Sequence, residues 1–162
     1  MGVFVDEDAE TIRQIAEDYA LDIIQLHGSE SPEFIHSLRS VCGDAIATIK
    51  AFNIAAPEDL EQTKVYEGLV DYFLFDTKAT LPGGSGQQFD WSILDAYKGE
   101  TPYLLSGGIG PSDADRVKTF LTSHLSPLTS KKCLGIDLNS RFETAPALKD
   151  VNLLKEFIKQ LR

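Results

Sequence analysis

Short apolar runs recur along the chain at intervals of about 20–31 residues, the length of one unit in a (βα)-barrel. Each run is rich in β-branched or aromatic residues and is too short for a buried helix. Because the runs are apolar on both faces, they are typical of parallel strands that are covered on both sides. The predicted strands are Gly2–Val5, Asp22–Leu26, Ala45–Ala51, Asp71–Phe75, Tyr103–Leu105 and Leu134–Leu138.

The segments between these runs carry signals for helices. Ser31-Pro32 places an N-cap serine before a proline at the first helical position, and Pro57 and Gly110-Pro111 open later helices in the same way. Asp90 is expected to cap a helix that begins at Trp91. An apolar stripe with helical spacing closes the chain at Val151, Leu154, Phe157, Ile158 and Leu161.

Strand and helix alternate throughout, which predicts right-handed βαβ crossovers and a parallel α/β sheet. The main alternative to a barrel is an open doubly wound sheet, whose dinucleotide-binding form needs a Gly-x-Gly-x-x-Gly turn after the first strand. Here Val5 is followed by Asp-Glu-Asp. There is no linker and no low-complexity stretch. The pattern therefore favours one (βα)-barrel domain of the TIM type over residues 1–162.

Composition excludes several classes of partner. The 162 residues suffice for one domain with a hydrophobic core, and their net charge is −10. Nucleic acids and anionic membranes bind basic patches, so neither is an expected partner. No apolar run approaches the roughly 20 residues that span a bilayer, and residues 1–10 lack the basic start of a signal peptide. We therefore expect a cytoplasmic protein.

Candidate chemistry lies at the carboxyl ends of the predicted strands, where (βα)-folds carry their active sites. Gln25 and His27 share a face by strand alternation, although His27 can also be a loop histidine without a function. Lys50 can either meet an anionic substrate or pair with a nearby carboxylate. Asp76 follows a very apolar run, and desolvation there would raise its pKa toward the range of a general acid. The alternative for Asp76 is an ion pair with Lys78.

Three loops complete the candidate site. The loop with Gly83, Gly84, Ser85 and Gly86 is too long for a minimal βα turn and predicts a lid or a backbone cradle. Two glycines before a helix N-terminus can direct N–H groups at a phosphate, and a plain turn is the alternative. Loops after the last two strands of a barrel often form such a phosphate site. The residues concerned are Ser106, Gly107 and Gly108, then Asn139, Ser140 and Arg141, and Asp137 supplies a carboxylate just before the second set.

These segments resemble phosphoribosylanthranilate isomerases, in the family's order and spacing and over essentially the whole chain. Any one motif is weak, whereas all of them together are specific. The motifs are Gly-Val-Phe-Val (2–5), Gln-Leu-His-Gly (25–28), Phe-Asp-Thr-Lys (75–78), Gly-Gly-Ser-Gly (83–86), Phe-Asp-Trp (89–91), Leu-Ser-Gly-Gly (105–108) and Gly-Ile-Asp-Leu-Asn-Ser-Arg-Phe-Glu (135–143).

The resemblance implies an enzyme of tryptophan biosynthesis that performs an Amadori rearrangement without metal or organic cofactor. Its substrate is a phosphosugar, N-(5′-phosphoribosyl)anthranilate, and its product is 1-(2-carboxyphenylamino)-1-deoxyribulose 5-phosphate. By resemblance, Asp76 is the acid that protonates the furanose ring oxygen, Asp137 lines the sugar site and His27 lies near the anthranilate. The phosphate is expected on the loops 106–108 and 139–140. Arg141, which replaces a glycine of many members, adds a cation there.

The chain also departs from the family. The family's base is a cysteine in a Lys-(Val/Ile)-Cys-Gly motif at the end of the first barrel strand, and this motif has no counterpart here. Cys42 and Cys133 each precede a predicted strand, have no metal-binding or redox partner nearby, and are expected to be buried or half-buried thiols.

Residues 1–4 coincide with the family's third strand, so the resemblance predicts six of eight βα units, with about 60 residues missing. An incomplete barrel of this kind would expose unpaired edges at Gly2–Val5 and Leu134–Leu138. We therefore expect a chain that is inactive alone and that self-associates or depends on the missing segment.

Two other functions stay open. The chain can be a different phosphosugar barrel, but indole-glycerol-phosphate synthase would need several lysines and glutamates at strand ends, where only Lys50 occurs. A pentose-phosphate epimerase would need metal-binding histidines there, where only His27 occurs. The second possibility is a phosphate-binding or assembly module without catalysis, which would bind phosphate esters without turning them over.

Overall fold

The protein is built on a six-stranded parallel sheet. A computed structural model describes residues 1–77, 90–124 and 133–162. The strands lie in the order of the chain, which is the order of a (βα)-barrel and differs from the reversed order of a doubly wound sheet. They are β1 (Gly2–Phe4), β2 (Ile23–Leu26), β3 (Ala47–Ile54), β4 (Tyr72–Thr77), β5 (Tyr103–Leu105) and β6 (Cys133–Ile136). The predicted parallel α/β sheet is confirmed.

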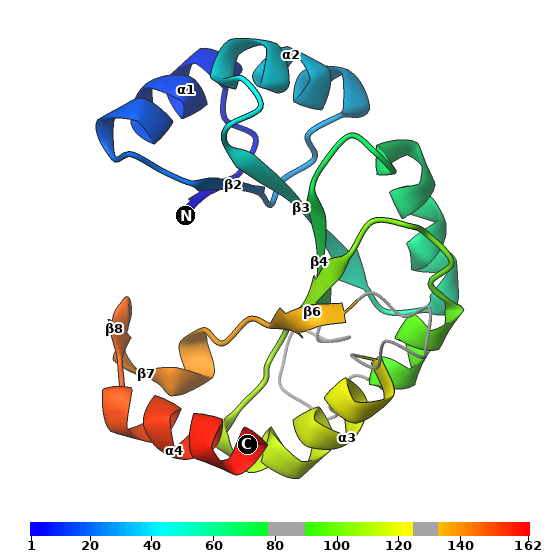
Figure 1. The fold of residues 1–162 in the computed structure, drawn as a ribbon, viewed down its shortest axis with the longest axis vertical. Helices are drawn as coiled ribbons and strands as arrows, with labels where there is room; N and C mark the ends of the chain where they lie inside the picture. The colour runs from blue at the N-terminus through cyan, green and yellow to red at the C-terminus, as the bar shows by residue number, and fades with distance from the viewer. Residues whose placement is uncertain (78–89, 125–132) are drawn as a thin grey trace.

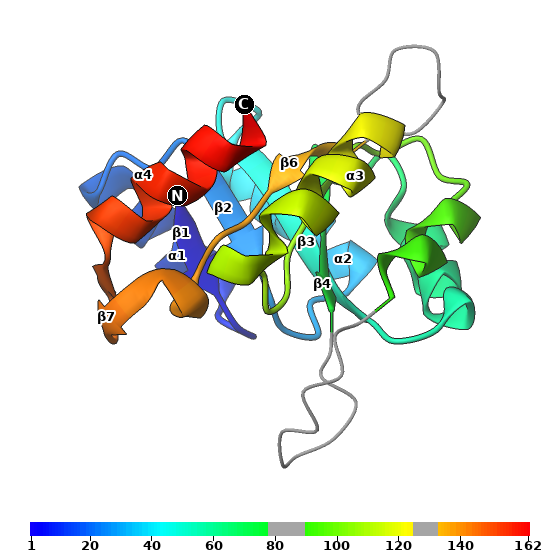
Figure 2. The same ribbon diagram turned by 90° about the horizontal axis from the view of Figure 1, so that it is seen from below.

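The strands form the inner side of an arc and the helices its outer side (Figure 1). Helices α3 and α4 lie side by side (Figure 2), and the Lys118 ammonium donates to the carbonyl of Gln160 at 3.2 Å. The α-helices are α1 (Ala9–Asp18), α2 (Pro32–Cys42), α3 (Ala114–His124) and α4 (Val151–Leu161). Four 3-10 helices complete the set: η1 (Pro57–Tyr66), η2 (Trp91–Ala96), η3 (Pro111–Asp113) and η4 (Ser140–Phe142).

The predicted caps are present. The Ser31 hydroxyl accepts the N–H of Phe34 at 3.2 Å at the start of α2, and the Asp90 carboxylate accepts the N–H of Ser92 at 2.9 Å. The helices after β3 and β4 are 3-10 helices, and each buries residues three positions apart. This spacing fits three residues per turn rather than the 3.6 of an α-helix. The buried pairs are Leu60 with Thr63 and Trp91 with Leu94.

The two faces of the sheet carry different cores. On the convex face, alternate side chains of the strands pack with the helices in the larger hydrophobic core. On the concave face a smaller cluster is formed by Ile49, Ala51 and Leu74, with Ile23, Tyr72 and Leu104 against it. Strand alternation separates the two sets, because neighbouring residues of a strand point to opposite faces.

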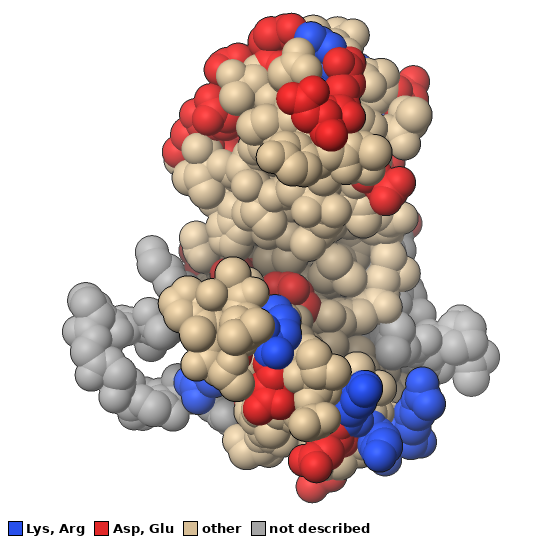
Figure 3. All heavy atoms as spheres, turned by 90° about the vertical axis from the view of Figure 1, so that its left-hand side faces the viewer, with Lys and Arg blue, Asp and Glu red and all other residues tan. Residues whose placement is uncertain are grey.

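The two end strands differ from the middle ones. Within the described ranges, β1 pairs only with β2, and β6 only with β5. Val3 is 56% exposed beside buried Phe4, and Leu134 is 53% exposed beside buried Cys133. The face that contains both ends of the arc is hollowed, and the middle of this face is mostly uncharged (Figure 3).

A small antiparallel hairpin of β7 (Glu143–Ala145) and β8 (Leu148–Lys149) precedes α4 and was not predicted. It lies at the opposite end of the arc from the N-terminus (Figure 1). The Lys149 ammonium holds it by donating to the Glu143 carboxylate at 2.7 Å. Of the helices in the part of the chain that the structure describes, none is long and apolar enough to cross a membrane.

Candidate active site

A cavity of about 250 Å³ lies at the carboxyl ends of the strands. Ten residues that were singled out from separate strand ends in the sequence line it together. They are Gln25, His27, Asp76, Ser106, Gly107, Gly108, Asp137, Asn139, Ser140 and Arg141. Met1, Val3 and Ile109 also line it. Sequence reasoning missed these three because apolar side chains give no chemical signal.

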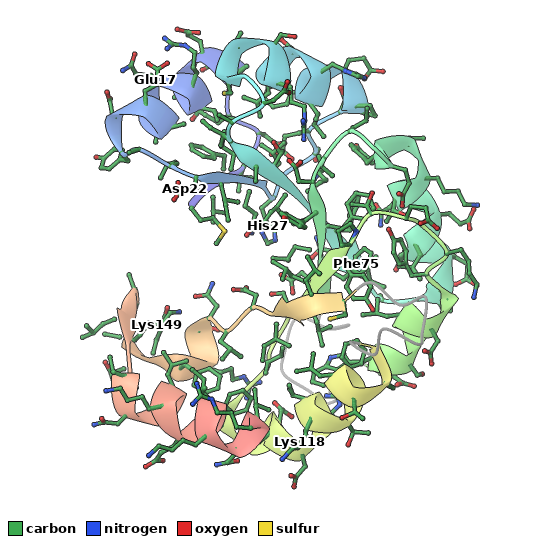
Figure 4. All side chains as sticks on the ribbon, viewed as in Figure 1. Glu17, Asp22, His27, Phe75, Lys118 and Lys149 are labelled. Carbon is green, nitrogen blue, oxygen red and sulfur yellow. The ribbon has the colours of Figure 1, made fainter. Side chains whose placement is uncertain are left out.

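One end of the cavity is formed by the ends of β2 and β4. The Gln25 amide nitrogen lies 3.0 Å from His27 Nδ1, within hydrogen-bonding distance. His27 Nε2 faces Asp76 Oδ2 at 3.6 Å, which is longer than a direct hydrogen bond. Their side chains are 30% and 28% exposed, so both are accessible to a ligand. His27 lies on the inner side of the arc, whereas Glu17 and Lys118 lie outside it (Figure 4).

Strand alternation explains how Asp76 reaches the cavity. In β4, Phe73 and Phe75 are fully buried in the convex core, while Leu74 belongs to the concave cluster. Asp76 therefore follows Leu74 on the concave face, one step beyond the last buried position. Its register partner on β3 is Asn53.

The other end of the cavity is formed by the loops after β5 and β6. The Ser106 hydroxyl donates to the Asp137 carboxylate at 3.0 Å, which joins the two loops. Gly107 and Gly108 have φ values of 93° and 65°, a left-handed conformation that favours glycine. A Cβ atom on Gly108 would meet nothing within 4 Å. This backbone therefore faces open space, where a ligand can approach it closely.

The loop after β6 supplies polar groups to the same end. The Lys149 ammonium donates to the Asn139 side-chain oxygen at 2.7 Å, which ties this loop to the β7–β8 hairpin. Arg141 follows on η4 with an exposed side chain. Sequence reasoning missed Lys149 because it lies ten residues beyond Asn139, in an element that was not predicted.

Lys50 lies outside this cavity. Strand β3 runs to Ile54, past the predicted end at Ala51, so Lys50 is a mid-strand residue on the face opposite Ala51. Its side chain is 3% exposed, and its ammonium lies 3.1 Å from the Glu30 carboxylate. Of the two alternatives for Lys50, the structure shows the ion pair. Its place in the strand interior was missed because the Ala45–Ala51 run ended the predicted strand too early.

A glycine-rich loop and two cysteines were also predicted to have particular roles. The proposed lid, Gly83 to Gly86, and Lys78 lie outside the described residues. Cys42 is half-buried at the end of α2, and Cys133 is buried on the convex face of β6, as expected for both thiols. Burial raises the pKa of the Cys133 thiol to about 11, so it is not a thiolate near neutral pH.

Parallel strands in chain order, with a polar cavity at their carboxyl ends, define an α/β protein of the (βα)-barrel class. Residues 1–160 match the family model described as N-(5′-phosphoribosyl)anthranilate (PRA) isomerase. The chain belongs to this family, whose members are isomerases of tryptophan biosynthesis.

Individual relatives agree with the family match. An N-(5′-phosphoribosyl)anthranilate isomerase of Parabacteroides distasonis is 51% identical over 161 residues, which are 99% of this chain and 68% of the relative. The crystal structure of phosphoribosyl anthranilate isomerase from Thermotoga maritima is 31% identical with a TM-score of 0.75. The match covers 99% of this chain and 71% of that one.

A further solved structure is a phosphoribosyl anthranilate isomerase in complex with reduced 1-(o-carboxyphenylamino)-1-deoxyribulose 5-phosphate. It is 27% identical with a TM-score of 0.72, and the match covers 99% of this chain and 69% of that one.

Proposed function

We propose that the cavity binds N-(5′-phosphoribosyl)anthranilate, with the phosphate on the loops after β5 and β6 and the sugar between Asp76 and Asp137. The observation that carries the proposal is the convergence of ten residues, from loops far apart in the sequence, on one cavity. The anthranilate end then lies toward His27. The Ser106–Asp137 hydrogen bond supports this orientation, because it couples Asp137, the residue proposed to contact the sugar, to the proposed phosphate loop.

Asp76 is the proposed general acid. It gives its proton to the furanose ring oxygen, the bond between C1′ and that oxygen breaks, and the anthranilate nitrogen forms a C=N bond to C1′. A base then removes the proton from C2′, and the resulting enolamine becomes the ketone of the product. The place of Asp76 supports this role, because it lines the cavity at the end of β4 with its side chain 28% exposed, where a bound substrate can meet it.

The phosphate end is proposed from backbone conformation and charge. Gly107 and Gly108 present the polypeptide without a side chain between it and the cavity, which suits close approach of an anion. Arg141 brings a guanidinium, the side chain best suited to a phosphate because of its planar set of donors.

The base is proposed to come from outside the described sheet. Neither Cys42 nor Cys133 lines the cavity, although the family's base is a cysteine. We propose that two further βα units between β6 and β1 close an eight-stranded barrel and bring this base. The exposed side chains of Val3 and Leu134 on the two end strands support closure, as does the greater length of the relatives. Without such units, the same surfaces would pair with a second copy.

Binding without turnover is the second candidate function. It is favoured by one observation, namely that both cysteines lie away from the cavity. A chain of this kind would hold a phosphate ester between the loops after β5 and β6 and release it unchanged.

Calorimetric titration with the reduced carboxyphenylamino-deoxyribulose phosphate tests the binding proposal. Gly108→Val places a side chain in the proposed phosphate space and should weaken binding at least about tenfold. Gly43→Val is the matched control, because Gly43 has the same sign of φ, +73°, and open space around it at the end of α2. The proposal fails if the unmodified chain binds no analogue, or if both variants lose affinity equally.

A further inference from the structure

We propose that the buried ion pair of Glu30 and Lys50 positions His27 for the reaction, an inference that rests on the proposed function. Glu30 Oε2 and Lys50 Nζ are 3.1 Å apart, and the two side chains are only 2% and 3% exposed. Neither residue lines the cavity. A buried ion pair is expensive to form and is weak evidence for stability, so its place beside the reacting end needs another explanation.

The pair holds both backbone groups of Gly28, the residue after His27. Both Glu30 carboxylate oxygens accept the Gly28 N–H at 3.0 Å, and the Lys50 ammonium donates to the Gly28 carbonyl at 2.8 Å. On the other side, the His27 N–H donates to the carbonyl of Phe4 at 2.8 Å. The backbone of His27 is therefore fixed from both directions.

The rest of the coordination leaves the pair little freedom. The Lys50 ammonium uses its remaining donor on the carbonyl of Ala51 at 3.1 Å, and Glu30 also accepts the N–H of Asp6 at 3.1 Å. A Cβ atom on Gly28 would lie 2.7 Å from the Asp6 backbone nitrogen, so only glycine fits at this crossing. The ends of β1 and β2 and the middle of β3 are thus tied together next to His27.

The consequence for function concerns the 3.6 Å separation of His27 Nε2 from Asp76. The imidazole reaches this carboxylate from a loop, and loops move unless their backbone is held. Fixing the two peptides around Gly28 keeps the ring within reach of Asp76 and of the substrate beside it. Glu30 and Lys50 act through His27, so they are positioning residues that need not contact the substrate.

The test compares two probes in the full chain. The reduced carboxyphenylamino-deoxyribulose phosphate reaches both ends of the cavity, whereas inorganic phosphate reaches only the loops after β5 and β6. Lys50→Met should weaken the first probe about tenfold and change the second by less than about twofold. In a His27→Asn background, Lys50→Met should cause no further loss. That absence of additivity is a result that a merely structural role would not produce.

Asp71→Asn is the matched control, because Asp71 pairs with Arg39 at 2.6 Å and lies just before β4, at the opposite end of the sheet from the cavity. It should leave both probes unchanged. If Lys50→Met does not fold, the double variant Glu30→Met and Lys50→Met removes both charges and the same contacts to Gly28, and the same results are expected. Parallel loss of both probes, or full additivity with His27→Asn, would overturn the positioning role. Failure of the unmodified chain to bind either probe would instead overturn the proposed function.

Discussion

Apolar side chains of the sheet differ in burial between its middle strands and its end strands. In the middle, Ile49 and Leu74 are 1% exposed in the small cluster on the concave face. On the end strands, Val3 and Leu134 carry the same kind of side chain but are more than half exposed. The residues next to them, Phe4 and Cys133, are buried in the larger core.

The difference follows from the neighbours of each strand. Phe4 and Cys133 belong to the larger hydrophobic core, where helices pack on the sheet, so they need no further partner. Within the described residues, each end strand pairs on one side only, and Val3 and Leu134 lack the cover that the middle strands have.

The same substitution should cost far more stability in the middle of the sheet than on an end strand. Leu74→Ala should lower the free energy of unfolding by about 2–5 kcal/mol, because it leaves a cavity among buried neighbours. Leu134→Ala should change it by less than about 0.5 kcal/mol, because the leucine is already solvated. Urea unfolding of both variants measures the contrast. Equal losses would show that the end strand is as well covered as the middle.

Charges on the exposed ends should weaken self-association. Val3→Lys with Leu134→Lys should raise the dissociation constant of the self-associated chain at least about tenfold, since each lysine would need to be desolvated in the contact. Sedimentation velocity over a range of concentrations measures this. Val41→Lys, which changes a partly exposed valine on α2, is the control and should have no effect. If the unmodified chain stays monomeric at every concentration, pairing through these surfaces is ruled out.

The smallest effect is expected when the Glu67 carboxylate gains its proton at low pH. Burial tends to raise the pKa of Glu67, but hydrogen bonds from Thr101, Tyr97 and the N–H of Glu100 outweigh it and lower this pKa below its usual 4.5. The stabilisation is therefore present above about pH 4.5 and is lost as the pH falls through the lowered value. Glu67→Gln should be less stable than the unmodified chain near neutral pH, with a difference that shrinks in acid.

Thermal unfolding between pH 3 and pH 7 follows this difference. Glu61→Gln, on the 3-10 helix η1 that ends just before Glu67, removes a carboxylate that is 68% exposed and should shift stability by less than about 0.5 kcal/mol. A constant difference for Glu67→Gln across the pH range would contradict the pKa argument.

The fold was largely predictable because short apolar runs and caps are local signals. All of the predicted strands are present; β5 has the predicted bounds, and the other strands have shifted ends. The 3-10 form of η1 and η2 was not predicted, since Pro57 and Asp90 mark where a helix begins but not how tightly it winds. The β7–β8 hairpin was missed because strands of two or three residues carry no periodicity.

The candidate site was predictable where a polar residue ends a strand, as at His27 and Asp76. It was not predictable where the contact is made inside the fold. Glu30 gave no signal, because two of its partners, Asp6 after β1 and Lys50 on β3, are distant in the sequence. Lys50 was expected at the end of β3, next to the cavity. The strand continues to Ile54, so Lys50 lies within it, on the face opposite Ile49 and Ala51.

The most direct test of the account is isomerase turnover with N-(5′-phosphoribosyl)anthranilate. It is measured for the purified 162-residue chain alone and after addition of a polypeptide that carries two βα units with the Lys-(Val/Ile)-Cys-Gly motif. The account predicts no turnover by the chain alone and turnover in the mixture, which Asp76→Asn abolishes. Turnover by the chain alone would show that its own residues supply the base. Turnover in the mixture that survives Asp76→Asn would contradict the assignment of the acid.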